Sequence, residues 1–133
     1  MYDVLIAIDD DEQRAVAQAR AVADLPDAAD SVTAHLCHVF TDNPEGASIS
    51  QVSAVRRAQE VLDAAGVEST HHETSGDPAT EIGATAAAVD ADTICVSGRK
   101  RSPAGKAVFG SVTQEVILSS DRPVLAVPRS RGE

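Results

Sequence analysis

The chain has 133 residues, enough for one domain whose single core buries about two thirds of the surface of the unfolded chain. It carries 21 acidic and 11 basic residues, a formal net charge of −10, which argues against general nucleic-acid binding. No apolar run approaches the roughly 20 residues that span a bilayer, and the first residues, MYDVLIAIDD, do not resemble a signal peptide. We therefore expect one cytoplasmic domain, residues 1–133, with no membrane contact.

Five short runs rich in β-branched residues predict strands at residues 2–9, 31–40, 66–75, 92–98 and 123–128. Helical periodicity predicts helices between them, at residues 12–24 and 50–65 and in two further segments. One of these begins at Asp77-Pro78, with an acidic N-cap and a proline at the first helical position. The other begins at Ser111, where Ser111 and Gln114 have the spacing of a capping box.

The alternation of strands and helices predicts a Rossmann-like, three-layer α/β/α sandwich around a parallel sheet. The first and fourth runs are almost continuously apolar, as expected for strands covered on both faces, whereas the third run is polar, as at a sheet edge. We expect the strand order 3-2-1-4-5, which places the ends of the first and fourth strands beside the point where the winding reverses.

The charge is distributed unevenly along the chain. Residues 1–97 have a net charge of −14 and residues 98–133 a net charge of +4. Four of the cations lie within eight residues of one another: Arg99, Lys100, Arg101 and Lys106. A solvated loop with scattered cations is one interpretation.

The position of this basic segment favours a different interpretation, a phosphate site. The segment begins at Gly98, where the fourth strand ends beside Asp9, and it leads to Gly110-Ser111 at the start of a helix. A helix N-terminus offers unpaired N–H groups and partial positive charge, both of which suit a phosphate.

At these residues the sequence resembles the universal stress protein family, in its nucleotide-binding branch, and the resemblance runs from the first to the fifth strand. That branch has a G-x2-G-x9-G-[ST] loop after the fourth strand. Gly98 matches its first glycine, Gly110-Ser111 match its final pair, and Val112 and Thr113 follow. Arg101 stands at the second glycine, one residue too close to Gly110, and Gly105 comes later in the loop.

The resemblance implies an adenine nucleotide, ATP or else AMP or ADP, with Mg²⁺ held through the phosphates, and a regulatory or stress-response role. It places Ala7, Ile8 and Asp9 at the nucleoside and Val39 against the adenine. The implied contacts around the phosphates are Ser97, Gly98, Lys100, Arg101, Gly105, Gly110, Ser111, Val112 and Thr113. Two alternatives stay open, namely that Asp9 caps the first helix and that Val39 is plain core.

The resemblance also implies a homodimer that forms through the fifth strand, Pro123 to Pro128, an apolar run at the sheet edge. An alternative function is therefore a nucleotide-free dimeric interaction module in which Arg101 and the shortened loop close the pocket. The sequence contains no GxSxG or Walker motif and no evident pairing of a nucleophile with a base. We expect no catalytic residues and at most weak ATP hydrolysis.

Cysteines and histidines predict neither a disulfide nor a metal site. Cys37 and Cys95 fall on strands that the expected order separates by one strand, about 9–10 Å apart, beyond the roughly 7 Å that a disulfide spans. His35 and Cys37 share a strand face near His71 and His72, but the spacing matches no zinc motif.

Overall fold

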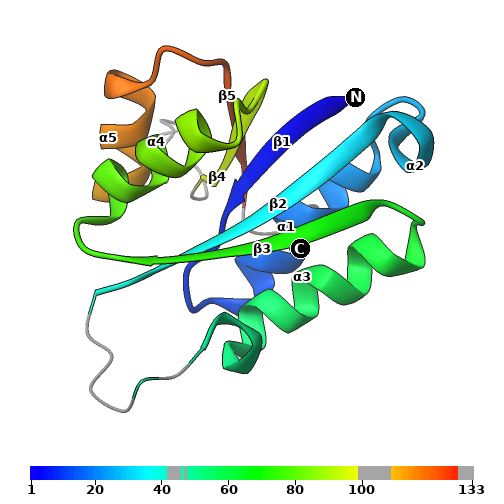
Figure 1. Cartoon of the computed structure of the whole chain (residues 1–133), viewed down its shortest axis with the longest axis horizontal. Coiled ribbons are helices and arrows are strands. Elements are labelled where there is room, and N and C mark those ends of the chain that lie inside the picture. The colour runs from blue at the N-terminus through cyan, green and yellow to red at the C-terminus, as the bar shows by residue number, and fades with distance from the viewer. Residues whose placement is uncertain (42–45, 47, 99–108, 129–133) are drawn as a thin grey trace, which may run out of the picture.

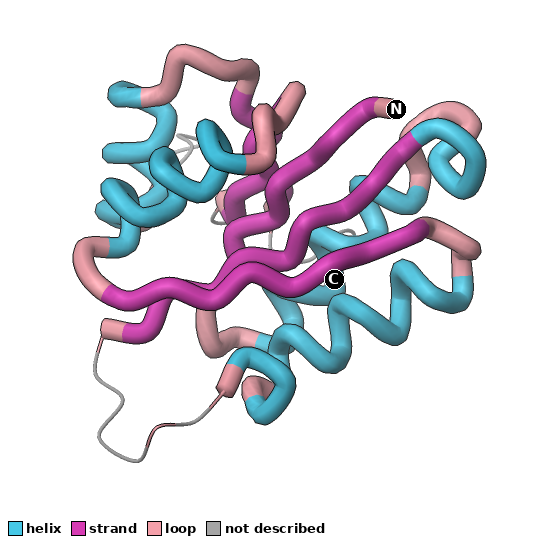
Figure 2. The backbone as a smooth tube through the Cα atoms, in the orientation of Figure 1, coloured by secondary structure: helices cyan, strands magenta, loops and turns pink. Residues whose placement is uncertain are grey.

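The computed structural model describes residues 1–41, 46, 48–98 and 109–128. The strands are β1 Tyr2–Ala7, β2 Val32–Phe40, β3 Glu68–Ser75, β4 Thr93–Ser97 and β5 Val124–Val127. They form one parallel sheet of order β3-β2-β1-β4-β5, which confirms the predicted order. The tube in Figure 2 shows the strands running side by side through the middle of the molecule.

Helices cover both faces of the sheet and complete the predicted three-layer sandwich. One face carries α1 Glu12–Ala23 and α3 Ser53–Ala64, and the other carries α4 Pro78–Ala88 and α5 Ser111–Ser119 (Figure 1). Two short helices, α2 Ala28–Ser31 and the 3₁₀ helix η1 Ile49–Gln51, were not predicted. No helix in the described ranges is both long and apolar enough to cross a membrane.

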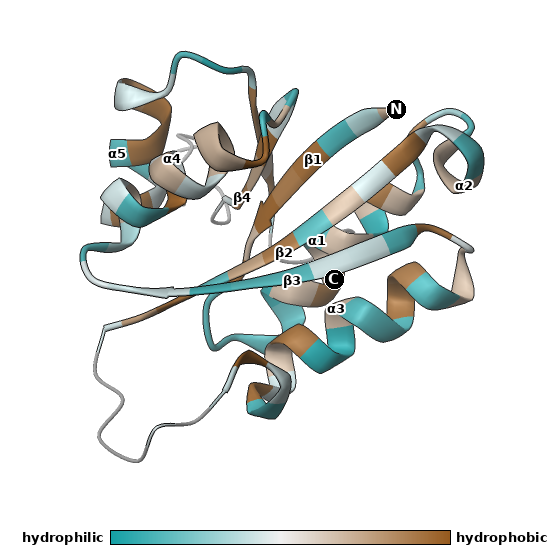
Figure 3. Ribbon diagram, viewed as in Figure 1, coloured by the Kyte–Doolittle hydropathy of each residue, from teal (hydrophilic) through white to brown (hydrophobic). Residues whose placement is uncertain are grey.

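The central strand β1 is buried on both faces. Val4 and Ile6 pack with α1 and α3, whereas Leu5 packs with residues of α4 and α5, and all three are inaccessible to solvent. At the other extreme, β3 is an edge strand made almost entirely of polar residues (Figure 3). The apolar run of β1 therefore marks the central strand and the polar run of β3 marks the edge strand, as predicted.

Helix ends follow the predicted signals in part. Asp77 caps α4 by accepting a hydrogen bond from the Thr80 N–H, with Pro78 at the first helical position. Gly66 follows α3 at φ +75°, a conformation that glycine adopts without a Cβ clash. The capping box predicted at Ser111 is wrong, because Gly110 occupies the N-cap of α5 and Ser111 is the first helical residue.

The helix predicted over residues 50–65 begins later than expected. The backbone N–H of Ser48 donates to Gln51 Oε1 at 2.7 Å, which closes η1 as a separate turn. The N–H of Ile49 donates to Glu73 Oε1 on β3 at 3.0 Å, which ties this turn to the edge of the sheet. Local capping therefore divides the segment before α3 begins at Ser53.

Candidate functional site

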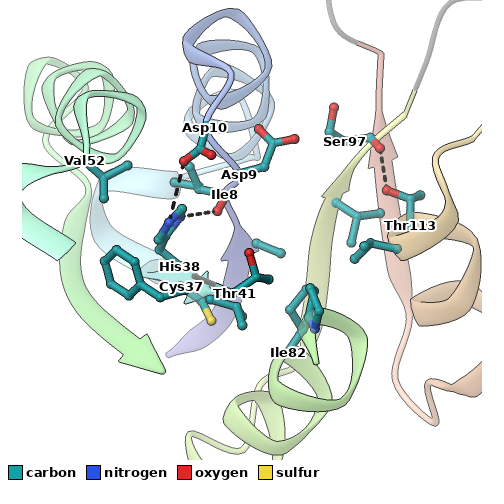
Figure 4. Close-up of a pocket in the computed structure, with 16 residues that line it drawn as sticks. Ile8, Asp9, Asp10, Cys37, His38, Thr41, Val52, Ile82, Ser97 and Thr113 are labelled. Atoms are coloured by element: carbon teal, nitrogen blue, oxygen red, sulfur yellow. Dashed lines mark hydrogen bonds and ion pairs between the residues drawn. The ribbon is translucent and has the colours of Figure 1, made fainter. Parts of the chain in front are cut away.

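A cavity of about 400 Å³ opens at the carboxyl ends of β1, β2 and β4. Its position is the topological switch point, since the chain passes from β1 to β2 and β3 on one side of β1 and then crosses to β4 and β5 on the other side. Figure 4 shows Ile8, Asp10 and His38 on one side of the space and Ser97 and Thr113 on the opposite side. The volume falls in the range of small-molecule sites, about 300–1,000 Å³.

The β1–α1 loop supplies an acidic rim. Asp9 accepts from the Asp11 N–H at 2.9 Å through Oδ1 and pairs with Arg14 at 2.9 Å through Oδ2. Asp11, not Asp9, is the N-cap of α1, because its side chain accepts from the Arg14 N–H. The Asp9 side chain is 51% exposed on the cavity rim, where its carboxylate can accept further hydrogen bonds.

His38 lines the cavity on the same side as Ile8 and Asp10 and is held in one orientation. Its Nδ1 lies 2.8 Å from the Ile8 carbonyl, so Nδ1 carries a proton and donates it. Its Nε2 lies 3.8 Å from a carboxylate oxygen of Asp10 at the rim (Figure 4), and its ring meets Phe40 edge-on with centroids 4.7 Å apart. These contacts hold the buried His38 ring, and Phe40 beside it, in the cavity wall at the end of β1.

The third wall joins β4 to the start of α5. The Thr113 hydroxyl donates to the Ser97 carbonyl at 2.7 Å, and the Gly98 N–H donates to the Val127 carbonyl at 2.6 Å. The first bond fixes the first turn of α5 beside the cavity (Figure 4), and the second holds the end of β4 against the end of β5. The N-cap residue, Gly110, has no side chain to pair with the first N–H groups of α5, so they suit an anion.

Gln18 of α1 lies beneath the fork between β1 and β4. Its Nε2 donates to the carbonyls of Ala7 at 2.8 Å and Cys95 at 3.3 Å, while its Oε1 is buried without a hydrogen-bond partner among the described residues. The register of β1 with β4 ends at Ile6 and Cys95. The Gln18 amide therefore donates hydrogen bonds to backbone carbonyls at the place where the two strands diverge and the cavity begins.

The structure brings many of the predicted site residues together. Those that line the cavity are Ala7, Ile8, Asp9, Val39, Ser97, Val112 and Thr113. Gly98, Gly110 and Ser111 lie on the β4 and α5 side but do not line the cavity as the described residues define it. Lys100, Arg101 and Gly105 lie outside the described residues.

Sequence reasoning missed most of the remaining wall. The additional lining residues are Asp10, Cys37, His38, Phe40, Thr41, Val52, Pro78, Ile82 and Val96. Pro78 had been predicted as the first residue of a helix that follows the third strand, and that place at the carboxyl end of a strand is a signal that could have found it. Val52 had no such signal, because it reaches the cavity from the turn after η1.

The described side chains offer little for catalysis or for a conventional metal centre. Burial raises the pKa of the Cys37 thiol to about 11, so this cavity residue stays protonated and is a poor nucleophile at neutral pH. The described ranges contain no group of three or more His, Cys, Asp or Glu side chains arranged to hold a metal. The apolar walls and the N-terminus of α5 suit a ligand with apolar and anionic parts.

Comparison with known proteins gives the family. A model of the universal stress protein family matches residues 1–128. No curated protein matches the chain.

Solved structures share the fold. A universal stress protein from Archaeoglobus fulgidus is 27% identical over 96% of this chain and 98% of that chain, with a TM-score of 0.78. A universal stress protein from A. fulgidus in complex with dAMP is 21% identical (96% and 98% covered, TM-score 0.71), and an AMP-bound family protein from Arabidopsis thaliana is 16% identical (100% and 95% covered, TM-score 0.72). Because the family model spans nearly the whole sequence, the chain belongs to the universal stress protein family.

Proposed function

We propose that this protein binds an adenine nucleotide in the cavity at the switch point and acts as a nucleotide-dependent regulatory or stress-response protein. The observation that carries the proposal is the cavity itself, which has apolar walls at one end and the first turn of α5 at the other. Support comes from fold relatives whose structures contain dAMP and AMP.

The apolar side of the cavity suits the base. Val39 and Ala7 are half-buried lining residues on one face of β2 and β1, and Ile82 of α4 closes the same end. Asp9 at the rim accepts a hydrogen bond from a ribose hydroxyl in this arrangement. The base and sugar therefore lie against β1 and β2.

The phosphates then lie against the β4–α5 wall. The first N–H groups of α5, next to Gly110 and Ser111, bear the partial positive charge of the helix N-terminus. We propose ATP as the ligand with the most favourable charge, with Mg²⁺ bound by its phosphates; AMP and ADP are the alternatives. The cations Lys100 and Arg101 precede α5 in the sequence and lie outside the described residues.

Isothermal titration with ATP and Mg²⁺, AMP and adenosine tests the proposal. We expect ATP to bind more tightly than adenosine, because adenosine lacks the charge that the helix terminus favours. If none of the three ligands binds with a dissociation constant below about 1 mM, the result contradicts nucleotide binding. That result would favour the nucleotide-free interaction module.

A single charge at the start of α5 sharpens the test. Ser111→Glu places a carboxylate at the exposed first residue of α5, where the helix dipole stabilises it and where it repels a phosphate. We expect ATP affinity to fall at least about tenfold. Gln114→Glu adds the same charge at an exposed position that does not line the cavity, and it should leave affinity within about twofold. Equal affinity in both variants contradicts the phosphate assignment.

We also propose a homodimer through β5 and its flanking prolines, Pro123 and Pro128. β5 ends the sheet, and Val124, Leu125 and Ala126 remain partly accessible along it. Sedimentation equilibrium should give twice the chain mass, and Leu125→Asp should give monomers. Val127 is unsuitable for this test because it is 6% exposed and its loss would damage the core. A monomer at all concentrations contradicts the dimer.

A further inference from the structure

Four polar side chains meet on one face of three neighbouring strands, away from the β4–α5 wall. They are Asp3 of β1, His35 of β2, and Thr70 and His72 of β3. In the sheet register His35 is paired with Thr70, and Cys37 is paired with His72, so alternation along the strands directs these side chains to one face. The spacing of these residues along the chain had predicted no metal site, because it matches no zinc motif.

Asp3 fixes the orientation of His35. A carboxylate oxygen of Asp3 lies 3.0 Å from His35 Nε2, so that nitrogen carries a proton and donates it to the carboxylate. In the neutral imidazole this leaves a lone pair on Nδ1, the nitrogen that faces His72 and Thr70. A carboxylate on the remote nitrogen also makes the other nitrogen a better metal ligand.

Three potential ligand atoms converge at equal distances. His35 Nδ1 and His72 Nε2 are 3.0 Å apart, and Thr70 Oγ1 is 3.0 Å from each of them. A tetrahedral zinc ion with bonds of about 2.0–2.1 Å holds neighbouring ligand atoms about 3.3 Å apart. The triangle needs to widen by a few tenths of an ångström to accept such an ion.

We propose that His35 and His72 bind one divalent transition-metal ion of the zinc type, with Asp3 orienting His35 and with the Thr70 hydroxyl and water completing the coordination. Imidazole nitrogen is a preferred ligand for zinc, copper and nickel. On binding, the ion replaces the hydrogen bonds among the three atoms. Because His35 Nδ1 is an acceptor, His72 Nε2 carries the proton of their hydrogen bond in the metal-free protein. When Nε2 binds the ion, that proton moves to Nδ1, so the imidazole stays neutral and no net proton is released.

The surroundings suit a metal that enters from solvent. Thr70 is exposed, and His35 and His72 are partly exposed at the edge of the sheet. In Figure 1 the amino-terminal halves of β2 and β3 extend beyond α4 and α5.

Zinc titration of the tag-free, metal-free protein tests the site. We expect calorimetry to show that one Zn²⁺ binds per chain. His72→Gln and His35→Gln should each weaken zinc affinity at least about tenfold. Asp3→Asn should weaken it about 10–100-fold with the same stoichiometry. His71→Gln is the matched control, since His71 lies on the opposite face of β3 with Gln59, and it should leave zinc affinity unchanged.

Histidine side-chain NMR of the unaltered protein gives a second readout that does not depend on the folding of a variant. Zn²⁺ should shift the imidazole nitrogen signals of His35 and His72 and leave those of His38 and His71 in place. Absence of binding, unchanged affinity in His72→Gln, or shifts confined to other histidines would overturn the proposal. None of the four residues of the proposed zinc site lines the cavity proposed for the nucleotide. A failure of nucleotide binding therefore leaves this test unaffected.

Discussion

Gln18 offers a sharp test of how the fork between β1 and β4 is held. The Gln18 side chain is 0% exposed, and its Nε2 donates hydrogen bonds to the Ala7 and Cys95 carbonyls at 2.8 and 3.3 Å. Gln18→Met keeps the volume and removes both hydrogen bonds. Each bond contributes about 1 kcal/mol, and an unpaired buried carbonyl costs about 1–3 kcal/mol. Loss of the unpartnered Oε1 offsets part of this, so we expect a net loss of about 1–3 kcal/mol.

Gln18→Glu replaces the donor with an oxygen that faces two carbonyl oxygens in a dry site. Burial raises the pKa of such a carboxyl, and a rise of about three units costs about 4 kcal/mol at neutral pH. Since the folded pKa then lies above the unfolded value, the lost stability returns as pH falls toward about 4. The methionine variant has no titrating group at this position and should show no such recovery.

Urea unfolding followed by far-UV circular dichroism measures both variants, because the chain has one tyrosine and no tryptophan to report by fluorescence. Gln18→Met as stable as the unaltered protein would refute the role of the amide. Gln18→Glu no less stable than Gln18→Met at neutral pH would refute the burial argument.

Three further predictions concern other parts of the fold. Burial raises the pKa of Cys37 to about 11 and of Cys95 to about 12, so a thiol reagent at pH 8 should label neither in the folded protein and both in urea; fast labelling of the folded protein contradicts the burial. Burial and neighbouring histidines lower the pKa of His72, so the unfolded state binds this proton more readily and stability should fall as pH drops below about 6.5; His72→Gln should flatten that part of the stability curve. Gly66→Ala at φ +75° should cost about 1 kcal/mol in urea unfolding, whereas no loss would show that the backbone there relaxes.

The sequence predicted the fold well because its main signals are local. The apolar run of β1, the polar run of β3 and the Asp77-Pro78 helix start each depend on a few adjacent residues, and the structure confirms all three. The strand order followed from the parallel alternation. Ser111 shows the limit of such signals, because the chain reaches α5 in an extended conformation at Gly110 and leaves Ser111 inside the helix.

The site was less predictable because its walls come from distant segments. His38 is directed to Ile8 and Asp10 by a hydrogen bond across 30 residues, and no spacing within β2 signals that contact. The pairing of His35 with Thr70 depends likewise on the register of two strands. Topology alone predicted that the strand ends at Asp9 and Gly98 lie side by side, whereas Ala7 and Ser97 followed from the family resemblance.

The two cysteines show how the same sheet geometry constrains the chemistry of thiols. Cys37 packs among residues of the α4 and α5 layer, and Cys95 packs among residues of the α1 and α3 layer. β1 lies between their strands, so the two cysteine backbones are separated by two strand spacings of about 4.8 Å each. Their side chains also lie on opposite faces of the sheet. A disulfide joins Cα atoms no more than about 7 Å apart, so both thiols stay free in any redox environment in which this sheet persists. An intramolecular disulfide in the folded monomer would require β1 to leave the centre of the sheet, and with it the switch point where the cavity forms.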